Sequence, residues 1–155
     1  MLVETKTGIR KASPSDVVEI VALVEEFFHE GLHKTGLSFD RATLTQSMTN
    51  IVRNNICLVH ENAGRVAGVI AGFITPSLFD SEEYLAQEII WFMTADARKG
   101  SGGADLLEAF EAACVDAGAN HVMMIHLADV NGRVMERFYR THGYRLIEQH
   151  FTKGV

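Results

Sequence analysis

Cysteine is scarce in this sequence, and membrane-targeting features are missing. The two cysteines, Cys57 and Cys114, lie in apolar stretches, which indicates buried reduced thiols and excludes the disulfide framework of a small secreted domain. No apolar run is long enough to span a membrane, and no charged and then apolar leader opens the chain. We therefore expect a cytoplasmic protein that does not bind a membrane.

Basic residues are also outnumbered. Fourteen lysines and arginines against 20 acidic residues give a formal net charge of -6, which opposes generic binding to nucleic acid. Apolar residues, in contrast, are plentiful: 47% of the 155 residues are hydrophobic, which is enough for one buried core. We expect a single domain over residues 1–155 that binds a small or cationic substrate.

The hydrophobic periodicity predicts a mixed α/β fold. Ser13-Pro14-Ser15-Asp16 has the N-cap residue and the early proline that begin a helix, and a second helix should follow Asp40. Asn62-Ala63-Gly64-Arg65 has the residues of a hairpin turn. The predicted order is β-α-α-β-β-β-α-β-α-β-β, a mixed central sheet with helices on both faces. The predicted strands cover residues 7–12, 56–60, 66–74, 88–93, 121–126, 144–147 and 149–152, and the two later helices lie at about 103–118 and 132–142.

A glycine-rich segment, Arg98-Lys99-Gly100-Ser101-Gly102-Gly103-Ala104, joins a predicted strand to a predicted helix. Such a turn leaves backbone N–H groups unpaired at the positive end of the helix dipole, here beside Arg98. The glycines could serve only to bend the chain, but their position between strand and helix favours a phosphate or pyrophosphate site. The segment lacks the Lys-Ser or Lys-Thr ending of a nucleotide P-loop, and no early glycine-rich strand-helix unit is present. A nucleotide-like ligand other than ATP or NAD is therefore expected.

Two motifs in this chain resemble those of the GNAT N-acetyltransferase family, and the resemblance covers residues 8–152. The glycine-rich segment is similar to the family's cofactor turn, with Ser101 at the place of the first fixed glycine. Asn131, Phe138-Tyr139 and His142-Gly143-Tyr144 are similar to a second family segment. The resemblance implies transfer of an acetyl group from acetyl-CoA to a primary amine, without a metal.

The resemblance also implies a cofactor site between two parallel strands that splay apart. The N–H groups of residues 101–104 and Arg98 would hold the pyrophosphate, and Asn131 would hold the pantetheine arm. Trp91 and Met93 would offer strand-edge backbone groups to that arm. The implied cofactor-binding residues are Trp91, Met93, Arg98, Lys99, Gly100, Ser101, Gly102, Gly103, Ala104 and Asn131.

Two residues are candidates for acid-base catalysis. A tyrosine with an ordinary pKa of about 10 is protonated near neutral pH, so Tyr139 could protonate the departing thiolate. Glu88 resembles the position from which histone-modifying members of the family deprotonate their substrate, and burial would raise its pKa towards a useful range. The alternatives are that Tyr139 is a core aromatic and that Glu88 is paired to a nearby cation.

Other functions remain open at this point. His29-Glu30-Gly31-Leu32-His33 matches the H-E-x-x-H pattern of a zinc peptidase, but Phe39 stands where the extended pattern needs a third histidine. A catalytically silent acyl-CoA-binding or regulatory module is the other rival. The acceptor could be a polyamine, an aminoglycoside, an amino acid or a protein amine, because the loops at 31–40 and 74–85 have no diagnostic chemistry. A homodimer is compatible with the resemblance.

Overall fold

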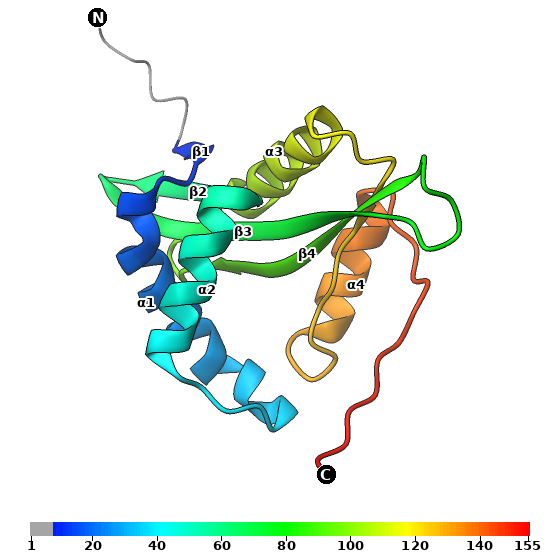
Figure 1. The fold of residues 1–155 in the computed structure, drawn as a ribbon. Coiled ribbons are helices and arrows are strands. Elements are labelled where there is room, and N and C mark those ends of the chain that lie inside the picture. Colours follow the sequence, from blue (N-terminus) through cyan, green and yellow to red (C-terminus); the bar gives the residue numbers. More distant parts are fainter. Residues whose placement is uncertain (1–7) are drawn as a thin grey trace, which may run out of the picture.

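The computed structural model describes residues 8–155, and its centre is a five-stranded mixed sheet (Figure 1). The strands lie in the order β1-β2-β3-β4-β5, antiparallel except for the parallel pair β4 and β5. Their bounds are β1 (Ile9–Lys11), β2 (Ile56–Asn62), β3 (Arg65–Pro76), β4 (Tyr84–Met93) and β5 (His121–Met123). The predicted α/β class is confirmed. Thr7, the first residue of the first predicted strand, lies outside the described residues.

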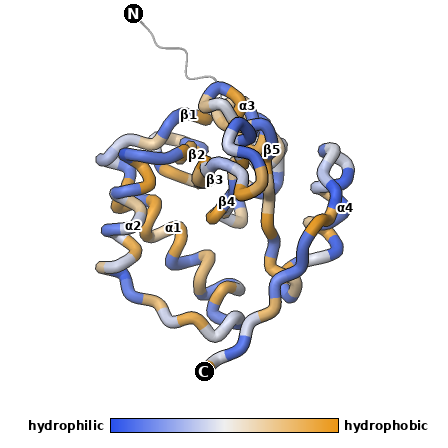
Figure 2. The backbone as a smooth tube through the Cα atoms, turned by 45° about the vertical axis from the view of Figure 1, so that its right-hand side comes forward, coloured by the Kyte–Doolittle hydropathy of each residue, from blue (hydrophilic) through white to orange (hydrophobic). Residues whose placement is uncertain are grey.

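In the described part of the chain, four α-helices pack against this sheet. They are α1 (Val17–Glu30), α2 (Arg41–Asn54), α3 (Gly102–Asp116) and α4 (Gly132–Thr141), with short 3-10 helices η1 (Pro14–Asp16), η2 (Leu32–Thr35) and η3 (Ala97–Lys99). Figure 2 shows α1 and α2 on one side of the sheet and α4 on the other. Over residues 8–155, no helix combines the length and the apolar character that crossing a bilayer requires.

The cap of α2 and the hairpin turn between β2 and β3 form as the sequence predicts. The Asp40 carboxylate accepts a hydrogen bond from the Thr43 N–H at 2.8 Å and so caps α2. Ala63 and Gly64 both have positive φ, 50° and 76°, as a two-residue hairpin turn between β2 and β3 requires. The predicted hairpin and both early helices are therefore confirmed.

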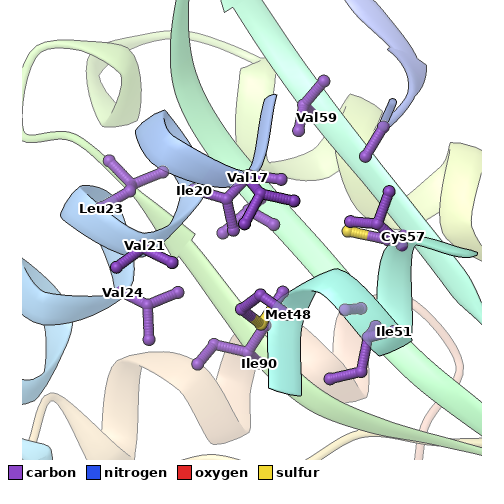
Figure 3. Close-up of a cluster of buried hydrophobic side chains, with 14 of the residues drawn as sticks. Val17, Ile20, Val21, Leu23, Val24, Met48, Ile51, Cys57, Val59 and Ile90 are labelled. Carbon is purple, nitrogen blue, oxygen red and sulfur yellow. The ribbon is translucent and has the colours of Figure 1, made fainter. Parts of the chain in front are cut away.

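Two apolar clusters hold the helices to the sheet. The larger one lies under α1 and α2 and includes Ile20, Met48, Cys57, Val59 and Ile90 (Figure 3). The second joins α3 to the opposite face through Ile70, Ala86, Met93, Leu106, Phe110 and Cys114. Both cysteines are buried and unpaired, as predicted, and burial raises the pKa of each thiol to about 12.

A β-bulge interrupts β4 at Ile89. Ala71 of β3 pairs with Ile90, whereas the next residue, Gly72, pairs with Glu88, so Ile89 is the extra residue. Because successive strand residues face opposite sides, the bulge shifts the alternation. Ile90 therefore faces the cluster under α1 and α2, whereas Glu88, opposite Gly72, faces the side of α3.

The C-terminal segment contradicts the prediction of two final strands. No regular secondary structure forms in residues 144–155, and the expected strands at 144–147 and 149–152 are absent. Figure 1 shows this segment running past α4 and away from the sheet. Its apolar side chains Leu146, Ile147 and Phe151 are exposed. The local pattern is typical of strands, but a strand needs a hydrogen-bonded neighbour, and this segment has none in the structure.

Asp16 forms a partly buried ion pair at the start of the fold. Its carboxylate contacts the Arg10 guanidinium at 2.7 Å, and this hydrogen bonding lowers the pKa of Asp16 to about 2. The pair joins β1 to η1, with the Asp16 side chain only 9% exposed.

Replacing Asp16 by asparagine should therefore lower the free energy of unfolding at pH 7 by about 1–3 kcal/mol. The pKa of Asp16 is lower in the folded protein than its ordinary value near 3.8. The ion pair therefore stabilises the fold above about pH 3.8, and this stabilisation is lost as the pH falls through about 2. Urea unfolding of wild type and variant at several pH values between 7 and 2 measures the difference. A difference that stays constant over this range would contradict the ion pair as its cause.

Candidate active site

A cavity of about 410 Å³ opens between β4 and the segment that follows β5. The start of α3 and one face of α4 complete its wall, and the end of α1 closes its other side. Most of the lining side chains are apolar, which is typical of small-molecule sites. The cavity brings together Glu88, Arg98, Gly103, Asn131 and Tyr139, which the sequence singled out from widely separated positions.

Part of the glycine-rich segment forms one end of this cavity: Arg98, Gly100, Gly103 and Ala104 line it, whereas Lys99, Ser101 and Gly102 do not. The first hydrogen bond of α3 runs from the Asp105 N–H to the Ser101 carbonyl at 2.9 Å, so the N–H groups of residues 102–104 precede the helical ladder. Ser101 has φ -78° and ψ -5°, a conformation open to any residue, so its replacement of a family glycine causes no backbone strain. A side chain added at Gly100 or Gly103 would meet no close neighbour. This arrangement suits an anionic ligand.

Arg98 lies beside these N–H groups, but part of its guanidinium already makes hydrogen bonds within the protein. Its Nε donates to the Met93 carbonyl at 2.8 Å, and its Nη2 donates to the Glu30 carboxylate at 2.9 Å. The guanidinium also lies 4.8 Å from the ring centre of Phe92. Among residues 8–155, Nη1 has no hydrogen-bond partner and is the part of Arg98 that can contact a phosphate. Lys99 pairs with Asp96 at 3.0 Å on the surface.

Among residues 8–155, no strand lies beside the β4 edge that faces the cavity over Glu88–Met93. β5 pairs with β4 only over Leu85–Gln87, and the predicted strand at 121–126 ends at Met123. Beyond that point the two segments separate, so Trp91 and Met93 lie on a stretch of β4 with a free edge. The Met93 carbonyl is covered by Arg98. The predicted splay between the two parallel strands is therefore present.

Asn131 begins α4 at the rim of the cavity. It adopts the left-handed region, φ 54° and ψ 30°, which asparagine tolerates better than most residues. Its side chain makes no capping hydrogen bond to the helix. The amide is therefore available to a ligand.

Glu88 is buried, with 2% of its surface exposed, and burial raises the pKa of its carboxyl to about 8. One carboxyl oxygen accepts a hydrogen bond from the Ile125 N–H at 3.1 Å. Among residues 8–155 the other oxygen has no partner, and Glu88 lines the cavity. The alternative of a strand-end glutamate paired to a cation does not fit these contacts. A buried carboxyl with a pKa near neutral pH can exchange a proton with a ligand.

Tyr139 is also buried, and its hydroxyl donates to the Ile125 carbonyl at 2.9 Å. Burial, with a smaller contribution from Glu88, raises the pKa of the Tyr139 phenol above its ordinary value. The hydroxyl therefore keeps its proton at neutral pH and can donate it. Rotation about the C–O bond is enough to point that proton elsewhere.

The H-E-x-x-H segment does not lie on one helix. α1 ends at Glu30, Gly31 follows, and His33 belongs to the separate η2. Glu30 pairs with Arg98, and the His33 Nδ1 lies 3.1 Å from the Phe28 carbonyl. Within residues 8–155, no three His, Cys, Asp or Glu side chains are close enough to hold a metal ion. The geometry that a zinc peptidase requires of this segment is not formed.

Sequence reasoning missed several residues of the cavity. Ile125 makes backbone hydrogen bonds to both candidate catalytic residues, Glu88 and Tyr139, and no side-chain motif could reveal such bonds. Met135 and Phe138 line the cavity from α4; Phe138 belongs to the second family-like motif, but neither residue was predicted to be part of the site, although their helical spacing beside Tyr139 was a usable signal. At the other end, Gly31 approaches so closely that an added Cβ would lie 2.5 Å from the Val130 side chain. This contact brings the end of α1 against the segment after β5.

The sequence matches no protein-family model and no curated protein, but solved structures match its fold. Glucosamine-6-phosphate N-acetyltransferase from Arabidopsis thaliana is 16% identical, with 94% of this chain and 96% of that one covered and a TM-score of 0.71. A predicted acetyltransferase from Clostridium acetobutylicum, solved with acetyl-CoA, is 13% identical over 94% of both chains, with a TM-score of 0.72. A transcriptional regulator from Bacillus halodurans is 16% identical, covering 95% and 98%, with a TM-score of 0.77. The chain has the fold of the GNAT N-acetyltransferases.

Proposed function

We propose that this protein transfers an acetyl group from acetyl-CoA to a primary amine. The observation that carries the proposal is that Gly103 and Ala104, whose N–H groups precede the hydrogen-bond ladder of α3, line the same cavity as Glu88 and Tyr139. Residues 101–104 and the Nη1 of Arg98 would hold the pyrophosphate. Asn131 and the free edge of β4 at Trp91 and Met93 would hold the pantetheine arm. Acetyl-CoA, when bound, supplies an acetyl group activated as a thioester.

The residues of the chain supply the proton transfers. Glu88 carries a proton below about pH 8 and is a base above it, so its free oxygen can take a proton from the amine. Tyr139 keeps its proton and can give it to the departing sulfur once its hydroxyl turns from Ile125. The largely apolar wall excludes water and so strengthens both interactions.

The composition of the cavity favours an acceptor with one amine on an apolar body. At its α1 end the lining side chains include Phe27, Leu32, Leu127 and Val130. Of the acidic residues that line the cavity, Glu30 is paired with Arg98, which leaves Glu88 to meet a cation. A polyamine or an aminoglycoside would place further ammonium groups against apolar side chains, at a cost in desolvation.

The experiment is a steady-state assay of coenzyme A release with phenethylamine, spermidine and kanamycin as acceptors. We expect kcat/KM for phenethylamine to exceed the other two by about 10-fold or more, since each unpaired buried charge costs more than 1.4 kcal/mol. Thermal unfolding with and without acetyl-CoA measures binding in parallel. Binding without release for any amine would favour a silent module, as in the second candidate below. Higher activity on spermidine would contradict the acceptor class alone.

The second candidate is an acyl-CoA-binding regulatory module of the same fold. It is favoured by the similarity in fold to the Bacillus halodurans transcriptional regulator. It predicts binding of acetyl-CoA with no turnover.

A further inference from the structure

The segment after β5 separates from β4 next to the bulge in β4. The parallel ladder ends at the pair Gln87 and Met123, and the bulge at Ile89 follows immediately in β4. A bulge bends its strand and increases the local twist, and within residues 8–155 β5 does not pair with β4 beyond this point. The backbone groups of Ile125, two residues beyond the ladder, therefore need other partners.

Side chains from two different elements supply those partners. The Glu88 carboxylate accepts from the Ile125 N–H at 3.1 Å, and the Tyr139 hydroxyl donates to the Ile125 carbonyl at 2.9 Å. In an extended strand the N–H and C=O of one residue point to the same side, where a neighbouring strand would normally lie. Here a side chain from β4 and one from α4 take the place of that strand. All three residues line the cavity.

We propose that Glu88 and Tyr139 act together as positioning residues that hold Ile125 away from β4 and keep the cavity open to its ligand. Glu88 reaches the Ile125 N–H from β4 itself, whereas Tyr139 reaches the Ile125 carbonyl from α4. Without them, the unpaired backbone of Ile125 would seek other partners, and β4 offers a free edge at which to find them. This inference rests on the proposed function only in naming coenzyme A as the ligand.

The test compares three variants with wild type. Glu88→Gln keeps an oxygen that can accept from the Ile125 N–H, whereas Glu88→Leu has similar volume and no acceptor. Tyr139→Phe removes only the hydroxyl. Amide hydrogen exchange of residues 122–127, measured without ligand, reports directly how firmly Ile125 is held. Calorimetric titration with coenzyme A reports its effect on binding, and circular dichroism confirms that each variant is folded.

We expect Glu88→Leu and Tyr139→Phe to speed amide exchange at Ile125 and its neighbours about 10-fold and to weaken coenzyme A binding by a similar factor. Glu88→Gln should stay within about threefold of wild type in exchange rate and in affinity. Unchanged amide exchange in Glu88→Leu would contradict the claim that Glu88 holds Ile125 in place. Faster exchange with unchanged binding would overturn its role in keeping the cavity open. If wild type itself fails to bind coenzyme A, the proposed function fails, and the exchange data still decide whether Glu88 and Tyr139 hold Ile125 in place.

Discussion

Replacing Tyr139 by phenylalanine is expected to lower kcat for acetyl transfer about 100-fold or more, the usual loss when a general acid is removed. The phenol is buried, its pKa is raised, and its hydroxyl lies on the cavity side of α4. The measurement is kcat at saturating acetyl-CoA, so that weaker binding of the donor does not enter the result. A kcat within threefold of wild type would remove Tyr139 from the chemistry.

Tyr144→Phe is the matched control for this variant. Tyr144 packs 5.6 Å from Tyr139, between ring centres, but its hydroxyl donates to the Glu111 carboxylate at 2.6 Å and does not line the cavity. Losing that hydroxyl should cost stability of about 1 kcal/mol and leave kcat within about twofold of wild type. Similar losses of kcat in both variants would indicate a general packing defect.

Replacing Gly103 by glutamate is expected to weaken acetyl-CoA binding by about 100-fold, since placing like charges side by side costs several kcal/mol. A Cβ at this position would meet only the Trp91 ring, at 3.8 Å, which is an ordinary contact. The fold should therefore tolerate the change. A carboxylate in the first turn of α3 is even favourable for the helix itself, because it interacts with the helix dipole.

Gly103→Gln separates charge from size in this experiment. Glutamine has almost the shape of glutamate, so binding that falls equally in both variants would indicate that bulk alone blocks the seat. We expect the glutamine variant to bind about 10-fold more tightly than the glutamate variant, and both to unfold at or above the wild-type temperature. Wild-type affinity in the glutamate variant would contradict a phosphate site at the start of α3.

Features that depend on neighbours in the sequence could be predicted. The hairpin turn at Ala63 and Gly64, the start of α1 and the glycine-rich segment before α3 all arise from backbone preferences of a few adjacent residues. The same local reasoning failed at residues 144–152, because a strand is defined by a partner and the alternating apolar pattern cannot supply one.

The connections within the site could not be predicted from the sequence, for a different reason. Arg98 pairs with Glu30, 68 residues away, and Ile125 is held by Glu88 and Tyr139 through its backbone. Every residue except proline carries the same backbone N–H and C=O, so nothing in the identity of Ile125 marks its role. The resemblance to a known family indicated which side chains would converge, and the structure shows which main-chain atoms join them.

The extra residue in β4 sets the phase of the whole strand. If Ile89 were instead paired regularly, with no bulge, Glu88 would be in step with Ile90 and Phe92, and its carboxyl would turn towards the aliphatic packing under α1 and α2. A related chain could thus keep the glutamate, the tyrosine and the glycines and still lose the site by pairing this strand without its bulge. In this fold, the register of one strand is as much a part of the chemistry as the residues that perform it.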